Sequence, residues 1–172
     1  MAIVVAPYDP DWARRFEEER ARLEPVLEPW LEGGVHHVGS TAVVGLAAKP
    51  ILDLMAGVRD LEESRAAFAP LGALGYEADP HRPGIAHHFV KRSSDGATTH
   101  GLHLTEPESD LWRERLAFRD ALRADPALAA EYEGLKRRLA GEHAEDAHAY
   151  VTGKRAFVAD VLARFGLQPG RR

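Results

Sequence analysis

Cysteine is absent from this chain of 172 residues. The absence excludes a disulfide framework, a thiolate zinc site, an iron–sulfur cluster and a thiol nucleophile. Long hydrophobic runs are absent too, because no stretch approaches the roughly 18 apolar residues of a membrane-spanning helix. The apolar run at residues 2–6 is short and has no basic residue before it, unlike a secretory signal peptide. We therefore expect a cytoplasmic protein without a membrane segment.

A broad surface of one charge sign is also missing. Residues 1–106 carry 10 Lys and Arg against 16 Asp and Glu, a net charge of −6, and residues 107–172 carry 12 against 11, a net charge of +1. Duplex nucleic acid is bound through a strongly basic face, so neither part is expected to bind it. A polyanion would have to be held by a local cluster of basic residues.

Hydrophobic spacing divides the chain into a mixed sheet followed by helices. A helix is expected from Asp9 or Asp11 to Leu27, with the run Glu17–Glu19 on its solvated face. Strands are expected over residues 3–6, 35–38, 50–58, 75–78, 86–92 and 98–105, with a helix over residues 61–71. The spacing after Pro107 predicts three helices, the last over about residues 145–165.

This order predicts one α+β domain over residues 1–172. Its sheet lies in residues 1–106 and its helical part in residues 107–166, and residues 167–172 are expected to fray. The sheet would be flanked by the N-terminal helix and the three C-terminal helices.

The sharpest local motif is the turn Gly39-Ser40-Thr41 after a predicted strand. Glycine lets the backbone approach a phosphate closely, and a hydroxyl group can donate to it. Thirteen residues after Ser40, Asp53 lies inside an apolar strand. A carboxylate there is costly unless it is paired or binds a metal. Asp53 therefore either belongs to a functional site or pairs with Lys49 or a backbone amide.

Histidines and basic residues supply further candidates. His103 lies on a later predicted strand, where it could face the same side of the sheet as Asp53 and act as a metal ligand; the alternative is a hydrogen-bonded structural histidine. In the helical part, three pairs of residues at i, i+4 spacing each share one helix face, and the faces could grip phosphates together. The pairs are Arg119–Arg123, Tyr132–Lys136 and Tyr150–Lys154. The alternative for Arg119 is a surface ion pair with Asp120.

The string HVGSTAVVGLAAKPILDLMAGV at residues 37–58 resembles the signature of the GrpB-like family, within the nucleotidyltransferase-fold superfamily. Other segments resemble the family's motifs in the same order. They are Tyr8–Trp12, Leu74–Tyr76, Leu102-His103, Leu116–Arg123, Tyr132–Lys136 and Tyr150–Lys154. The resemblance covers nearly the whole chain.

This resemblance implies a polymerase-β-like nucleotidyltransferase fold. In that superfamily a Gly-Ser turn binds nucleotide phosphates, and two carboxylates in Asp-x-Asp with a third on a neighbouring strand hold divalent metals. Here Met55 occupies the second carboxylate position, and His103 stands where the third acid is placed. One aspartate with histidines suits a single Mn²⁺, Zn²⁺ or similar ion better than two Mg²⁺ ions, which prefer oxygen ligands.

The first hypothesis is an enzyme that transfers a nucleotidyl or phosphoryl group to a small molecule or a protein. Asp53 and Lys49 would be its catalytic residues, and Asp53, His103 and His37 would hold one Mg²⁺, Mn²⁺ or Zn²⁺ ion. The residues expected to bind phosphates are Gly39, Ser40, Thr41, Arg119, Arg123, Lys136 and Lys154.

Two alternatives stay open. The missing second carboxylate favours a non-catalytic module that binds a nucleotide or a coenzyme A precursor, or assists a metabolic enzyme. Similar domains fused to dephospho-CoA kinase imply the same role. Metal-dependent hydrolysis by histidine and aspartate ligands is the third hypothesis. A separation of more than about 8 Å between Asp53 and His103 would exclude shared metal ligation.

Overall fold

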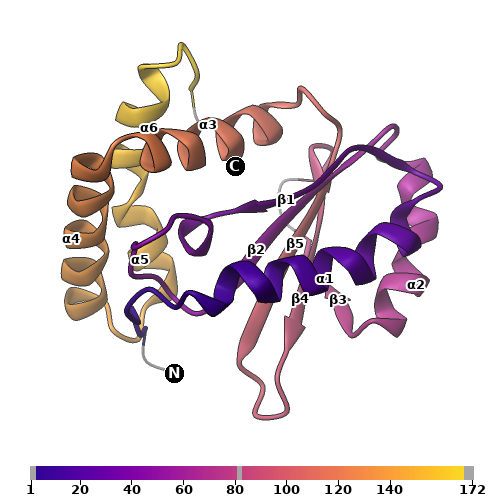
Figure 1. The fold of residues 1–172 in the computed structure, drawn as a ribbon, viewed down its shortest axis with the longest axis horizontal. Helices are drawn as coiled ribbons and strands as arrows, with labels where there is room; N and C mark the ends of the chain where they lie inside the picture. The colour runs from indigo at the N-terminus through magenta and orange to yellow at the C-terminus, as the bar shows by residue number, and fades with distance from the viewer. Residues whose placement is uncertain (1–2, 81–82, 169–172) are drawn as a thin grey trace.

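The protein is described by a computed structural model that covers residues 3–80 and 83–168 (Figure 1). Its centre is a five-stranded sheet in the order β1-β2-β5-β4-β3. The strands are β1 (Leu31–Val38), β2 (Leu52–Val58), β3 (Tyr76–Ala78), β4 (Ala86–Arg92) and β5 (Thr98–Thr105). β2 and β5 run parallel, and the other neighbours are antiparallel. The expected α+β class with a mixed sheet is confirmed.

One face of the sheet is covered by the N-terminal helix α1 (Asp11–Leu27), which crosses it in Figure 1. Its apolar residues pack with those of β2 and β5 in the main core, beside the 3-10 helix η2 (Glu63–Ala67) and the short helix α2 (Phe68–Ala73). Trp12 and Leu23 on α1 are at most 1% exposed. Burying a large apolar side chain contributes roughly 1.5–3 kcal/mol, so this stripe fixes α1 on the sheet.

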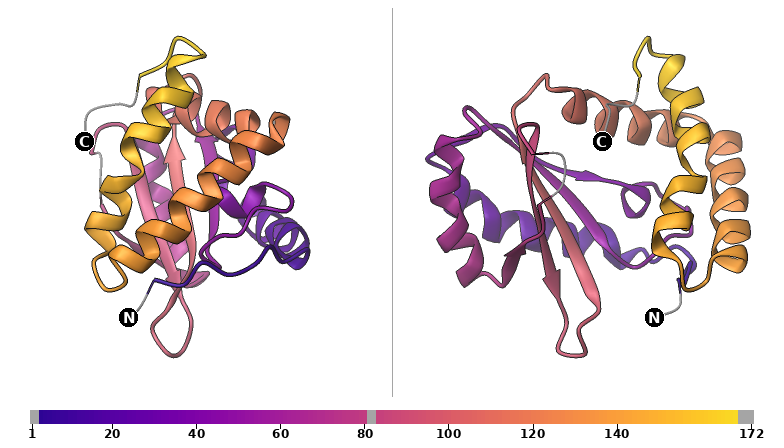
Figure 2. Two further views of the ribbon diagram at one scale, coloured as in Figure 1. Left: turned by 90° about the vertical axis from the view of Figure 1, so that its left-hand side faces the viewer. Right: turned by 180° about the vertical axis from the view of Figure 1, so that it is seen from behind.

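The remaining helices start over the other face of the sheet, where Trp112 packs with Val38 and Met55, and continue past the end of β1 and β2 that lies away from α2 (Figures 1 and 2). They are α3 (Asp110–Ala124), α4 (Pro126–Glu142), α5 (Ala147–Gly153) and α6 (Arg155–Ala163). Ser109 caps α3 by accepting a hydrogen bond from the Trp112 amide, and Asp125 caps α4 in the same way. Within the described residues, no helix is both long and apolar enough to span a bilayer.

Several element boundaries differ from those expected. The last helix, expected unbroken over about residues 145–165, divides at Lys154 into α5 and α6. Gly153 ends α5 close against Leu139, where a Cβ on Gly153 would lie 2.5 Å from a Leu139 methyl carbon. The helix expected over residues 61–71 is η2 followed by α2. The frayed tail expected over residues 167–172 falls mostly on residues 169–172, which lie outside the described residues.

Two differences concern the strands. The strand expected over residues 35–38 begins at Leu31, so Gly33 and Gly34 lie inside β1, with φ angles of 79° and 83°. The pairing of β1 with β2 is irregular there, so the glycines form a bulge that the strand passes through. The strand expected over residues 3–6 is only an isolated bridge between Ala6 and Ala48.

The assignment of Glu19 to a solvated helix face is wrong. Glu19 is 3% exposed and accepts hydrogen bonds from the Tyr76 hydroxyl group at 2.8 Å and the Lys91 ammonium group at 2.9 Å. Its position continues the spacing of Trp12, Phe16 and Leu23 on the buried face of α1. The carboxylate therefore ties α1 to β3 and β4.

Candidate functional site

The Gly-Ser turn lies directly against Asp53. β1 ends at Val38, Gly39 follows with a φ of 72°, and the 3-10 helix η1 (Ser40–Ala42) begins. A Cβ on Gly39 would lie 2.5 Å from Asp53 Oδ2. Only glycine combines this backbone conformation with so close an approach.

A pocket of about 110 Å³ opens beside this turn. It is bounded by the turn, the segment before β2, helix α4 and the junction of α5 and α6. Its lining residues are Ser40, Thr41, Ala48, Lys49, Ile51, Asp53, Lys136, Tyr150 and Lys154. The fold thus brings six of the residues expected at the site, from positions 40 to 154, around one small cavity.

Charges in the pocket influence one another strongly. Burial raises the pKa of Asp53, while the positive charges of Arg115, Lys154 and Lys49 oppose that rise. Burial lowers the pKa of Lys49, and the Asp53 charge opposes the change. Burial, with repulsion from Lys154, lowers the pKa of Lys136 to about 7. The pocket is lined by three lysines, Lys49, Lys136 and Lys154, and by one carboxylate, Asp53, so its charge favours an anionic ligand.

Each lysine is held by a specific neighbour. The ammonium group of Lys49 lies 4.2 Å from the centroid of the Tyr150 ring, and that of Lys154 lies 4.4 Å from it. Lys136 donates a hydrogen bond to the Ala47 carbonyl oxygen and is 2% exposed. Lys49 therefore acts on Asp53 through its charge while its ammonium group packs on an aromatic ring.

The two hydroxyl groups of the turn differ in their contacts. Thr41 Oγ1 lies 2.9 Å from His37 Nε2 and donates to the Ile51 carbonyl oxygen at 3.2 Å. Ser40 is half-buried, and its hydroxyl group partly opposes the rise in the pKa of Tyr132 that burial causes. Thr41 thus holds the turn in place, and Ser40 presents its hydroxyl group at the pocket wall.

The structure does not bring Arg119 and Arg123 into this pocket. Arg119 Nη1 donates to the His37 carbonyl oxygen at 3.1 Å, and its Nε donates to Asp120 at 2.7 Å. Arg123 Nε donates to the Ala42 carbonyl oxygen at 2.9 Å. The two guanidinium groups therefore hold backbone carbonyls on either side of the turn.

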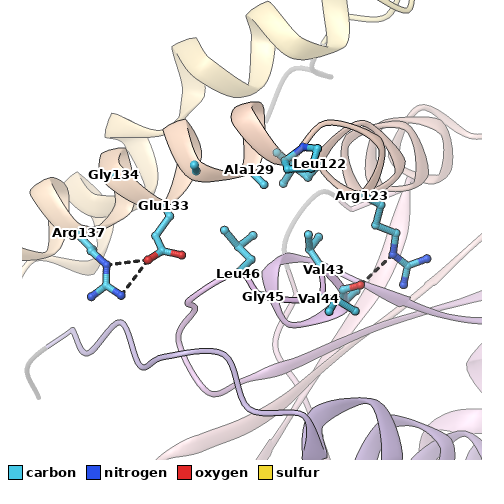
Figure 3. Close-up of a pocket in the computed structure, with 13 residues that line it drawn as sticks. Val43, Val44, Gly45, Leu46, Leu122, Arg123, Ala129, Glu133, Gly134 and Arg137 are labelled. Carbon is cyan, nitrogen blue, oxygen red and sulfur yellow. Dashed lines mark hydrogen bonds and ion pairs between the residues drawn. The ribbon is translucent and has the colours of Figure 1, made fainter.

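Arg123 borders a larger groove instead (Figure 3). This groove, about 810 Å³, lies between residues 42–46 and helices α3 and α4. Its carboxylate, Glu133, already accepts hydrogen bonds from the Ala47 amide at 2.9 Å and from Arg137 at 3.0 Å. Most of the other lining residues are apolar or small, so the smaller pocket has the chemistry of a phosphate site despite its size.

The histidines do not assemble around Asp53 as expected. In the β1–β2 register, Val38 lies opposite Asp53 and His37 lies opposite Leu54, so His37 faces the other side of the sheet. Its ring stacks on Phe16 at a centroid distance of 4.7 Å. Burial, with repulsion from two nearby arginines, lowers its pKa to about 4 and keeps it neutral.

His103 shares the Asp53 face but lies two residues beyond Gly101, which is the direct partner of Asp53 on β5. A Cβ on Gly101 would lie 3.1 Å from Asp53 Oδ1 and 3.5 Å from His88 Nε2, so His88 also approaches this region. Met55, at the second position of Asp-x-Asp, is fully buried.

Across residues 3–80 and 83–168, no group of three or more histidine, aspartate or glutamate side chains is arranged to hold a metal ion. Asp53 is instead acted on by three cations. The donor set therefore does not fit the ion expected on Asp53, His103 and His37.

Sequence reasoning did not assign the roles of three neighbours of the pocket. The charge of Arg115 acts on both Asp53 and Tyr132. Arg115 precedes Arg119 by one helical turn, and this spacing was the available signal. Helical spacing pairs Tyr132 with Lys136 and Tyr150 with Lys154, but the positions of the two rings beside Ser40 and the lysines depend on tertiary packing.

The mixed sheet with its flanking helices has the polymerase-β-like nucleotidyltransferase fold. Terminal uridylyl transferase 4 from Trypanosoma brucei, solved with bound dUTP, matches with a TM-score of 0.54 and 13% identity, over 94% of this chain and 56% of that one. The Cid1 poly(U) polymerase, solved with MgGTP bound, matches with a TM-score of 0.54 and 18% identity, over 80% and 44% of the two chains. At these identities the likeness concerns the fold.

The chain belongs to the GrpB family, whose model, described as "GrpB protein", matches residues 2–164. The glutamate-rich protein GrpB of Alkalihalophilus pseudofirmus is 30% identical, over 93% of this chain and 94% of that protein. The crystal structure of the conserved protein GrpB from Enterococcus faecalis matches with a TM-score of 0.85 and 31% identity, over 94% and 96% of the two chains. A dephospho-CoA kinase of Mycolicibacterium paratuberculosis is 27% identical, over 93% of this chain and 45% of that protein. The expected family and fold are confirmed.

Proposed function

We propose that this protein binds a nucleotide, or a related phosphorylated small molecule, with a phosphate group in the pocket beside Gly39 and Asp53. The observation that carries this proposal is the pocket wall, where a hydroxyl group and three lysines from distant parts of the chain surround one small cavity. Such a wall is complementary to a phosphate, which accepts hydrogen bonds and carries negative charge.

Pocket size and charge set the orientation of the ligand. A volume of about 110 Å³ holds about four waters, since a water occupies about 30 Å³ in the liquid. One phosphate group fits this space, and the rest of the molecule must lie outside. Ser40 would donate to a phosphate oxygen, and Lys49 and Lys154 would neutralise its charge. The dUTP and MgGTP bound to fold neighbours support a nucleotide as the ligand.

The first test measures thermal unfolding of the full chain with inorganic phosphate, ATP, CTP, GTP, UTP or dephospho-CoA, with and without Mg²⁺, Mn²⁺ or Zn²⁺. Binding to the folded state stabilises it by RT ln(1 + [L]/Kd), about 2.7 kcal/mol at a ligand concentration of 100 Kd. We expect at least one phosphate compound to raise the melting temperature, and Lys49→Gln to weaken that binding about tenfold.

Arg137→Gln is the matched control, because Arg137 lines the larger groove and pairs with Glu133 at the surface. This variant should bind phosphate compounds like the wild type. The proposal fails if none of the compounds stabilises the wild-type protein at millimolar concentration. A role in assisting a metabolic enzyme, supported by the match to dephospho-CoA kinase, would then be the better explanation.

Nucleotidyl transfer is the second candidate function, and the position of Asp53 in the pocket wall favours it. An acceptor hydroxyl oxygen would bond to the α-phosphorus, the bond to pyrophosphate would break, and the hydroxyl proton would pass to the Asp53 carboxylate. The raised pKa of Asp53 suits a general base.

Asp53→Asn separates the two functions. Removing the carboxylate removes its repulsion of the phosphate, so we expect this variant to bind phosphate compounds as tightly as the wild type or more tightly. A transferase would at the same time lose turnover, measured as pyrophosphate release in the presence of an acceptor. A wild-type protein that binds nucleotides and releases no pyrophosphate with any acceptor would be a binding module.

A further inference from the structure

Tyr150 connects the two lysines that reach the pocket from different parts of the chain. Lys49 precedes β2, Lys154 lies between α5 and α6, and both ammonium groups approach the same phenol ring, at 4.2 Å and 4.4 Å from its centroid. Tyr150 is 1% exposed, and its ring forms part of the pocket wall. The ring is thus the shared contact of two cations beside a cavity.

This arrangement has an energetic consequence for an anion. A lysine side chain loses rotamer entropy when it is fixed, and two neighbouring cations repel each other. The face of an aromatic ring attracts a cation that lies over it. The ring therefore offsets part of the entropy loss and part of the charge repulsion before a ligand binds. An anion then binds to two ammonium groups that are already in position.

Pocket size adds a steric limit. The wall of this cavity of about 110 Å³ includes Ala48, Ile51 and Tyr150, which offer mainly apolar surface. A phosphate with one substituent can enter with that substituent directed outward. A phosphate with two substituents must place part of the second one against this wall.

We propose that Tyr150 is a positioning residue that holds Lys49 and Lys154 as a pair, so that the pocket selects a terminal phosphate monoester over a phosphodiester. A monoester carries close to two negative charges at neutral pH, and a diester carries one. The inference rests on the proposed function and specifies its ligand class, which is the free phosphate end of a nucleotide or coenzyme A precursor.

The experiment uses methyl phosphate and dimethyl phosphate, which differ by one methyl group and one charge. Isothermal titration of the full chain at pH 7.5 gives the affinity for each compound in wild type, Tyr150→Phe and Tyr150→Leu. We expect wild type to prefer methyl phosphate at least tenfold. Tyr150→Phe keeps the ring and should retain this preference within about twofold. Tyr150→Leu should lose about tenfold in affinity for methyl phosphate and little for dimethyl phosphate.

A purely structural role for Tyr150 would weaken both compounds alike and leave their ratio unchanged in Tyr150→Leu, which would overturn the inference. If circular dichroism shows that Tyr150→Leu does not fold, the test uses Lys49→Gln and Lys154→Gln instead. Each of these variants should reduce the preference for methyl phosphate over dimethyl phosphate. A preference unchanged in both would also overturn it. Failure of wild type to bind any phosphate compound would refute the proposed function itself. Phosphate binding with equal affinity for the two methyl compounds would refute only this inference.

Discussion

Replacement of Gly39 by alanine is expected to lower the free energy of unfolding by about 2–4 kcal/mol and to abolish binding of phosphate compounds. Two costs combine at this position. A non-glycine residue at a φ of 72° is strained, and the new Cβ would lie 2.5 Å from Asp53 Oδ2. Either the carboxylate or the turn must move, and both form the pocket. Chemical denaturation and phosphate titration measure the two effects.

Gly45→Ala is the matched control for backbone strain. Gly45 has a φ of 81°, but a Cβ there would meet no atom within 4 Å. We expect this variant to lose only about 1 kcal/mol of stability and to keep phosphate binding. Asp53→Ala should reduce the extra cost of Gly39→Ala, since it removes the carboxylate oxygen from the contact. Additive effects of Gly39→Ala and Asp53→Ala would contradict this explanation.

The turn and its partner carboxylate could be predicted from sequence because each rests on local chemistry. Glycine before a hydroxyl residue at a strand end indicates a tight turn, and a charged residue in an apolar strand indicates a special site. The contact between Gly39 and Asp53 needs one further fact, the β1–β2 register. Local sequence does not specify that register across the bulge at Gly33 and Gly34.

The same limit explains why His37 was grouped with Asp53. The two residues belong to different strands, so parity within one strand cannot say whether they share a face. The pairing of Val38 with Asp53 in the sheet shows which face each residue occupies. It places His37 on the opposite face, which α1 covers.

The basic residues of the helical part were harder to assign than the turn. Helical spacing places Arg119 and Arg123 on one face, but it does not say whether that face meets a ligand or a backbone carbonyl. The contacts with the His37 and Ala42 carbonyls are long-range and follow from how α3 packs. The meeting of Lys49 and Lys154 on Tyr150 likewise joins residues about a hundred positions apart.

Glu19→Ala is expected to lower the free energy of unfolding by about 2–4 kcal/mol at pH 7, because it leaves Lys91 and the Tyr76 hydroxyl group without their buried acceptor. Glu17→Ala is the matched control within the same acidic run. Glu17 is exposed and pairs with Arg20 at the surface, so its replacement should change stability by less than about 0.5 kcal/mol. Urea denaturation of the two variants measures both values.

The stabilisation by Glu19 is also expected to depend on pH in a defined direction. Burial alone would raise the pKa of Glu19, but hydrogen bonds from Lys91 and Tyr76 and the Lys91 charge outweigh burial and lower it below its ordinary value of 4.5. A lowered pKa in the folded state stabilises the protein above the unfolded-state pKa, and the contribution disappears as the pH falls through the folded-state value. The stability difference between wild type and Glu19→Ala should therefore be constant near neutral pH and shrink below about pH 4.5. A difference that persists unchanged at pH 3 would show that packing, rather than the carboxylate charge, is the source of the stabilisation.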